Sequence, residues 1–217
     1  MGKEHATPRS PSRGGSRTRR SPAPQERVRD AERSKQQLLA AALEEFARKG
    51  FAGARVQDIA TRAGLSQQLI TYYFGGKQGL AQAVKQSWET QEATFAGSDK
   101  SLEQMVTGYV HATLANPLMA RMFLWEGLNS DEPSTGQTGV SPLGSPDVTE
   151  LARRQAAGEL SGDVDPRFVL LIFMGAVAAP IIMPQVARRV TGLEPDSQEF
   201  EARYANELRV VLHHLRG

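Results

Sequence analysis

The sequence predicts an all-α protein with a small N-terminal helical domain and a larger C-terminal helical domain. In most segments, apolar residues recur at positions i, i+3, i+4 and i+7, the spacing that gives a helix one buried face. Gly, Pro, Asn and Ser separate these segments. Of the 217 residues 40% are hydrophobic but only 6% aromatic. We therefore expect a core built mainly from Leu, Ala, Val and Ile.

Composition also excludes several kinds of protein. No stretch holds the roughly 18 consecutive apolar residues of a membrane span, and no apolar segment follows the basic N-terminus, so neither a membrane partner nor a secretory signal is expected. The chain has no cysteine, which rules out disulfides and thiolate metal sites and fits a cytoplasmic protein. His213 and His214 are neighbours, so they lie roughly 100° apart on a helix and cannot share a metal. No metal and no cofactor are expected.

Residues 1–25 differ from the rest in charge and composition. They hold six basic side chains and one acid, which leaves 20 basic and 23 acidic groups in the remainder. The segment is rich in Ser, Pro, Gly and Arg and has almost nothing to bury, so we predict a disordered basic tail. It is either an arm that lies on nucleic-acid phosphates or a solvated extension with no fixed role.

The first predicted helix runs from Arg27 to Lys49, and Gly50 is the expected residue after its end. Phe51 then begins a short connection in which Gly53 allows flexibility. The predicted buried stripe consists of Leu38, Leu39, Ala42, Leu43 and Phe46. The residues expected to face water are Glu44, Glu45, Arg48 and Lys49.

Residues 55–80 predict two short helices that meet at a corner. Gly64 can take a positive φ and end the first helix, and Ser66 can cap the second by accepting from its free N–H groups. The second helix ends at Gly75 and Gly76. This layout is typical of a helix-turn-helix, whose second helix enters the DNA major groove, so residues 26–80 are predicted to form a DNA-binding domain. The apolar stripes are Val56, Ile59, Ala60 and Ala63, then Leu69, Ile70, Tyr73 and Phe74.

The pattern over about residues 33–85 resembles the DNA-binding domain of TetR-family (tetracycline-repressor-like) regulators. The resemblance implies an all-helical homodimer whose variable C-terminal domain usually binds a small molecule. It rests on Leu38, Ala41, Ala42, Phe46, Gly50, Phe51, Val56, Asp58, Ile59, Ala60, Ala63, Gly64, Leu65, Ser66, Tyr73, Phe74, Lys77 and Leu80.

The resemblance assigns base reading to the first exposed turn of the second helix. Gln67 and Gln68 stand there, and Gln can pair bidentately with adenine; the alternative is that both merely face solvent. Thr71 lies on the same face and can touch a thymine methyl, while Tyr72 extends the surface. Ser66, at the start of the helix, belongs to the same predicted surface.

Other positions are expected to hold the DNA backbone. Tyr73 and Lys77 match the phosphate-contacting positions of the family, and Lys77 lies beside the N-terminus of the following helix. Gln57 is a lesser candidate for a base contact. At positions 54 and 55 the family commonly has Thr or Ser; here Ala54 and Arg55 stand instead, so Arg55 is expected to contact a phosphate by charge.

Residues 81–217 are predicted to form the ligand-binding and dimerisation domain. Leu80, Val84 and Trp88 predict a connecting helix to about Thr94, after which Ser98 or Asp99 caps the next helix. Further helices are expected at 101–115, 118–128, 148–160, 167–190 and 198–215, with a long mobile loop at 129–146. Pro180 and Pro184 predict a kink or an early end in the segment at 167–190.

Two interpretations of the C-terminal domain remain open. Its bulky residues form either the lining of an apolar ligand pocket or an ordinary core. Its last two long helices either pair with their two-fold mates, as the resemblance implies, or bury one core within a monomer. The predicted pocket residues are Met105, Tyr109, Met122, Phe123, Trp125, Phe173 and Met174.

These features predict a DNA-binding transcriptional regulator. The leading hypothesis is a homodimeric repressor, located in the bacterial cytoplasm and at the nucleoid when bound, that holds a palindromic double-stranded DNA operator. A small apolar or amphipathic effector releases it. The alternative is a ligand-independent architectural or global regulator, or an activator. An enzyme is not expected, because no catalytic constellation is present.

Overall fold

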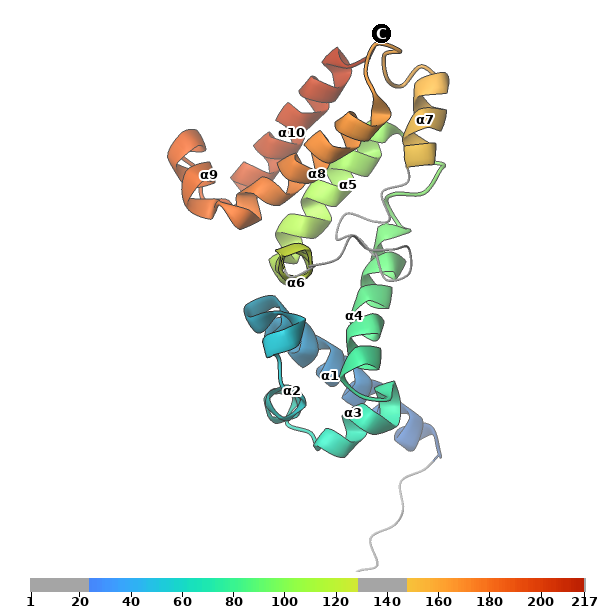
Figure 1. Cartoon of the computed structure of the whole chain (residues 1–217), viewed down its shortest axis with the longest axis vertical. Coiled ribbons are helices and arrows are strands. Elements are labelled where there is room, and N and C mark those ends of the chain that lie inside the picture. The colour runs from blue at the N-terminus through green and yellow to red at the C-terminus, as the bar shows by residue number, and fades with distance from the viewer. Residues whose placement is uncertain (1–23, 129–147, 217) are drawn as a thin grey trace, which may run out of the picture.

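The fold is given by a computed structural model that describes residues 24–128 and 148–216. These ranges contain helices and no strand, so the predicted all-α class is confirmed. Three helices form a head at one end of the molecule, and a fourth rises from it to a body (Figure 1). The predicted tail up to residue 23 and the predicted loop at 129–146 lie outside the described residues. The head and its connecting helix are α1 (Pro24–Gly53), α2 (Val56–Ala63), α3 (Gln67–Phe74) and α4 (Lys77–Glu92).

Between residues 102 and 214, the described part of the body contains the remaining six helices. The long helices α5, α8 and α10 run side by side, α6 lies between them and the head, and α9 projects from one end (Figure 1). These helices are α5 (Leu102–Ala115), α6 (Pro117–Leu128), α7 (Val148–Ala156), α8 (Pro166–Ile182), α9 (Pro184–Thr191) and α10 (Gln198–His214).

α1 is longer than predicted and changes direction at Gly50. That residue has φ 68° and ψ 172°, a conformation open in practice to glycine only. The expected break at Gly50 is therefore present, but residues 51–53 continue as a short helical turn. Glu45 contradicts the prediction of an exposed side chain, because it is fully buried.

The turn of the helix-turn-helix forms as its glycine predicts. The Gly64 amide donates to the Thr61 carbonyl at 3.1 Å, and the Leu65 amide donates to the Ala60 carbonyl at 3.0 Å. This pair of bonds closes the end of α2 with Gly64 at φ 67°. Ser66 occupies the position before α3, but its hydroxyl makes no capping hydrogen bond. The predicted capping role of Ser66 is therefore wrong.

α4 packs along α1 and shares its core. Leu80, Val84 and Trp88 are buried as predicted, in one cluster with Phe46 and Ile59 of the head. The same cluster continues into α6 through Met119, Met122 and Phe123. The head and the body are thus in contact through apolar side chains, and α4 belongs to the core of the head over most of its length.

The first body helix is capped at a different residue from those predicted. Ser101, not Ser98 or Asp99, accepts from the Gln104 amide, and the Gln104 side chain accepts from the Ser101 amide in return. This reciprocal capping box satisfies two amides that a helix start leaves free. The predicted helix at 148–160 also ends earlier, at Ala156.

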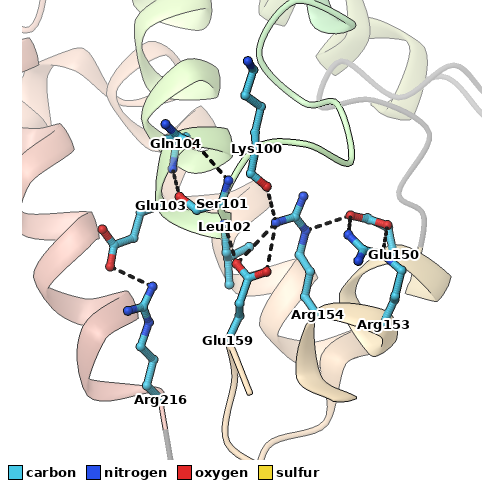
Figure 2. Close-up of polar contacts among 10 residues, drawn as sticks. All are labelled: Lys100, Ser101, Leu102, Glu103, Gln104, Glu150, Arg153, Arg154, Glu159 and Arg216. Carbon is cyan, nitrogen blue, oxygen red and sulfur yellow. Dashed lines mark hydrogen bonds and ion pairs between the residues drawn. The ribbon is translucent and has the colours of Figure 1, made fainter. Parts of the chain in front are cut away.

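A buried arginine holds α7 against the start of α5 (Figure 2). The Arg154 guanidinium donates to the Lys100 carbonyl at 2.7 Å and lies 2.9 Å from Glu150 and 3.3 Å from Glu159. Glu159 in turn accepts from the Leu102 amide at 2.8 Å. Arg154 is fully buried, and its two carboxylate partners neutralise its charge there.

The long apolar segment after Pro166 divides into two helices, as its prolines predict. α8 ends at Ile182, α9 begins at Pro184, and the two are bent by 94°. In the described part of the chain, no helix alone has the length and apolarity to cross a membrane, and only this bent pair reaches them together. On α8, Phe168, Leu171 and Ile172 are each more than 60% exposed. This side of α8 is therefore left uncovered, whereas Val169, Phe173 and Val177 are buried.

Candidate DNA-binding surface

α3 lies at the end of the head that is farthest from the body (Figure 1). Ile70 is fully buried and anchors the helix, and Leu69 is partly buried. Gln67, Gln68 and Thr71 are exposed on the opposite side. The structure therefore brings the predicted base-reading residues together on one outward face.

Tyr72 is the most prominent side chain of this face, with 78% of its surface exposed. Its ring touches that of Tyr73 edge-on, with 5.0 Å between the centroids. α3 carries no charged residue, so nothing on it repels a phosphate. Positive charge for a nucleic-acid backbone must come from the neighbouring segments.

Arg55, Gln57 and Ser66 lie on the two segments next to α3, and all three are exposed. Arg55 precedes α2 with an extended backbone, and its side chain makes no capping hydrogen bond. This absence is expected, because arginine lacks the capping hydroxyl of the Thr or Ser that the resemblance leads one to expect there. The unused Ser66 hydroxyl and the Arg55 guanidinium both remain suited to contact a phosphate.

Lys77 is partly buried at the first position of α4. Its ammonium lies 4.5 Å from the centroid of the Phe51 ring and donates to the Ala52 carbonyl at 3.4 Å. Burial lowers the pKa of this lysine. The side chain is thus held beside the start of α4, whose free amides also favour an anion.

The structure adds one basic side chain that the sequence interpretation missed. The Lys35 ammonium lies 5.7 Å from the centroid of the Tyr73 ring, which brings α1 to the predicted phosphate-contacting end of α3. The sequence held a signal for this position. Lys35 precedes the buried Leu38 by three residues, so the two share one face of α1.

An ion-pair network fixes α2 on α1 and so orients the whole surface. The Lys49 ammonium donates to Asp58 at 2.8 Å and lies against Glu45, while Arg62 contacts Glu44 at 2.7 Å and Glu45 at 3.3 Å. The hydrogen bond from Lys49 is the main cause that lowers the pKa of both Glu45 and Asp58. Both carboxylates are therefore ionised at neutral pH.

The residues of the predicted body pocket are divided between two regions. Met122 and Trp125 line a cavity of about 310 Å³ between the head and α6. Phe123 lies in the cluster shared with the head, Phe173 in the body cluster, and Tyr109 touches both clusters. Met105 packs against the body cluster, and Met174 on α8 is partly buried. The ligand role of these residues stays a prediction.

No group of three or more metal-binding side chains occurs within residues 24–128 and 148–216. A half-buried acid, Glu92, is the last residue of α4. The Tyr109 hydroxyl donates to Glu92, and burial raises the pKa of both groups. This pair links α4 to α5.

Two family profiles match the chain, one before and one after the end of α4. Residues 38–84 match the family described as bacterial regulatory proteins, tetR family. Residues 101–208 match the tetracyclin repressor-like C-terminal domain. The first match contains α2 and α3, and the second contains most of the body.

Individual proteins agree with these matches. The HTH-type transcriptional repressor SCO4008 of Streptomyces coelicolor is 31% identical over 173 residues, which cover 76% of this chain and 87% of that protein. The repressor NicS of Pseudomonas putida is 26% identical over 144 residues, covering 63% and 68%.

Solved structures show the same fold. The crystal structure of SCO4942 from Streptomyces coelicolor superposes with a TM-score of 0.64 at 25% identity, over 84% of this chain and 98% of that one. HlyIIR, a haemolysin II transcriptional regulator, gives 0.52 at 16% identity, over 82% and 97%, and so shows the fold alone. Sequence profiles, relatives and fold agree, and the chain therefore belongs to the TetR family of transcriptional regulators.

Proposed function

We propose that this regulator is a homodimeric repressor that places α3 of each subunit in successive major grooves of a palindromic operator. The outward face of α3, with Gln67, Gln68, Thr71 and Tyr72 exposed and no charged residue, is the observation that carries the proposal. Amide side chains read adenine edges in the major groove, and a methyl group reads thymine. Arg55, Lys35 and Lys77 supply the phosphate contacts on either side.

Repression is the direction of regulation that the relatives support. SCO4008 and NicS are both described as transcriptional repressors. A repressor works in the cytoplasm by occupying its DNA site. It needs to bind and to position its recognition helices, and it needs no chemical reaction. We therefore assign this chain no catalytic role.

Dimerisation is supported by an apolar face that one chain leaves uncovered. Phe168, Leu171 and Ile172 of α8 and Val210 and Val211 of α10 are all exposed in the single chain. An apolar face of this kind is covered by an equivalent face in a two-fold dimer. Two recognition helices must then lie about 34–36 Å apart to reach successive grooves on one side of DNA.

The dimer is released from the operator if an effector binds more tightly to a conformation in which the spacing of the two heads does not match successive major grooves. Such a ligand shifts the population off the operator by its difference in affinity between the two states. The continuous apolar contact from the head through α6 into the body provides the physical connection. A small apolar or amphipathic molecule is the proposed effector class.

Single substitutions separate base reading from backbone binding. Gln67→Ala is expected to cost about 1–3 kcal/mol on the preferred operator and to relax its sequence at one position. Lys77→Gln keeps the packing against Phe51 but removes the charge, so it should weaken binding to all duplexes alike and reduce the salt slope by about one. Fluorescence anisotropy on operator and random duplexes, over a range of salt, measures both.

Gln91→Ala provides the control, because Gln91 is exposed at the far end of α4. It should leave affinity and salt slope unchanged. If Gln67→Ala and Gln68→Ala both bind the operator with the wild-type preference over random DNA, α3 does not read the bases and the proposal fails.

A further inference from the structure

The cavity between the head and α6, which we name the junction cavity, lies outside the interior of the body. It measures about 310 Å³, at the small end of the range for small-molecule sites. Three helices contribute to it, the end of α1, the first half of α4 and the end of α6. Its lining residues are Phe46, Phe51, Ala52, Gln78, Ala81, Gln82, Lys85, Met122, Trp125 and Glu126.

The walls of the junction cavity are aromatic and partly open to water. Phe51 is 46% and Trp125 39% exposed, whereas Phe46 and Met122 are buried beneath them. Large aromatic surfaces left in water are unfavourable and gain from cover. Ring faces and a methionine side chain fit a flat aromatic guest.

The polar groups of the cavity include hydrogen-bond donors that suit a carboxylate on that guest, although Glu126 balances the charge of Lys85. Lys85 is 7% exposed, and its ammonium pairs with Glu126 at 2.5 Å. An ammonium can donate three hydrogen bonds, so the pair can admit a second carboxylate. Lys77 adds a further positive charge against the Phe51 ring, and Gln78 and Gln82 carry amide donors.

We infer that the junction cavity is an effector site for a flat aromatic carboxylate. The ring lies between Phe51 and Trp125, and the carboxylate accepts from Lys85. This inference rests on the proposed function, because it names the place and the chemistry of the molecule that releases the operator. The effector then binds at the interface between the head and the body.

Binding at this interface acts directly on the position of the head. The contact of α1 with α6 is the most extensive one between two helices in the described part of the chain. Within this contact, the Trp125 ring lies against the Gly50 backbone. A Cβ atom at position 50 would lie 3.3 Å from the nearest atoms of the indole. A guest held by α1, α4 and α6 together therefore favours one tilt of the head on the body, and hence one spacing of the recognition helices.

Calorimetric titration of the full chain tests the site with two probes, 2-naphthoate and the neutral 2-naphthamide. We expect naphthoate to bind once per chain and at least tenfold more tightly than naphthamide. Ala52→Leu fills the cavity from an exposed position and should weaken naphthoate at least tenfold. Ala40→Leu, an equal change at an exposed position elsewhere on α1, should have no effect.

Lys85→Met should abolish the preference for naphthoate over naphthamide without abolishing the binding of either. Naphthoate should also weaken operator binding at least fivefold, and operator should weaken naphthoate binding by the same factor, since coupling is reciprocal. Absence of naphthoate binding, binding that Ala52→Leu leaves intact, or binding that leaves operator affinity unchanged overturns the inference.

The same preparations separate this inference from the proposed function. A wild-type protein that retains specific genomic fragments but ignores naphthoate keeps the repressor role and loses the junction site. A protein that binds naphthoate in the cavity but prefers no duplex over random DNA has neither the repressor role nor an effector site. The Kd for naphthoate, measured without DNA, still shows whether the cavity binds the probe.

Discussion

Gly50 shows how a single residue can connect the head to the body. Its φ of 68° and ψ of 172° turn the chain out of α1, and the absence of a side chain lets the Trp125 ring lie on its backbone. The sequence indicates the first property, since a Gly after an apolar stripe ends a helix. It cannot indicate the second, because Trp125 is 75 positions away.

Gly50→Ala is expected to destabilise the protein by about 3 kcal/mol, because alanine is strained in this conformation and meets the indole. Gly76→Ala is the matched control. Gly76 has a similar backbone conformation, with φ 115° and ψ −165°, but open space where the methyl would go. We expect about 2 kcal/mol there by urea unfolding, and a shift in tryptophan emission only for Gly50→Ala. Equal losses and equal spectra would contradict the proposed contact.

At the scale of the helical element, the packing of α2 on α1 depends on ion pairs to a buried carboxylate that the sequence predicts to be exposed. Spacing correctly assigns Leu38, Ala42 and Phe46 to the core. It assigns Glu45 to solvent, because a charged residue next to an apolar stripe is usually exposed. The error arises because Lys49 and Arg62 compensate the buried carboxylate, and Arg62 comes from another helix.

Glu45→Gln is expected to lower the free energy of unfolding by about 2 kcal/mol at pH 7, since it weakens hydrogen bonds to charged groups. The pKa of Glu45 is lowered in the folded protein, chiefly by the hydrogen bond from Lys49. Its contribution is therefore complete above the ordinary glutamate pKa of 4.5 and is lost as the pH falls through the lower folded value.

Urea unfolding of wild type and Glu45→Gln between pH 7 and pH 3 measures this dependence. The two stabilities should converge towards pH 3. Glu44→Gln is the control, because Glu44 is 49% exposed and its pair with Arg62 should contribute less than about 1 kcal/mol. A gap between wild type and Glu45→Gln that stays constant down to pH 3 would show that the ionised carboxylate is not the cause.

The sequence predicts the order of the helices, but it predicts only some of the contacts between them. Periodicity and the Gly and Pro breaks approximately locate the ten helices that the described residues form, including the break at Pro184. The cap at Ser101 and the buried Arg154 were missed because both depend on partners that folding brings together. For the site, α3 is exposed as expected, whereas Lys35 and the junction cavity are formed by packing between separate helices.

At the scale of the whole molecule, the uncovered face of α8 should decide the oligomeric state. Leu171→Glu places a charge on this face and is expected to convert a dimer into a monomer. Sedimentation equilibrium should give twice the chain mass of 23.7 kDa for wild type and once that mass for the variant. Val148→Glu, also at an exposed apolar residue but on α7, should remain dimeric. A monomeric wild type at micromolar concentration would contradict a symmetric pair of heads.

In the proposed repressor, two α3 helices related by symmetry read one DNA site. Retention of sheared genomic DNA by the full-length protein, followed by sequencing of the retained fragments, tests it most directly. We expect the wild-type fragments to share an inverted repeat whose half-sites are centred about 10 base pairs apart. The double variant Gln67→Ala, Gln68→Ala should retain no such repeat. Retained fragments that share no inverted repeat, or that match random DNA in sequence, would show that the two α3 helices do not read one symmetric site.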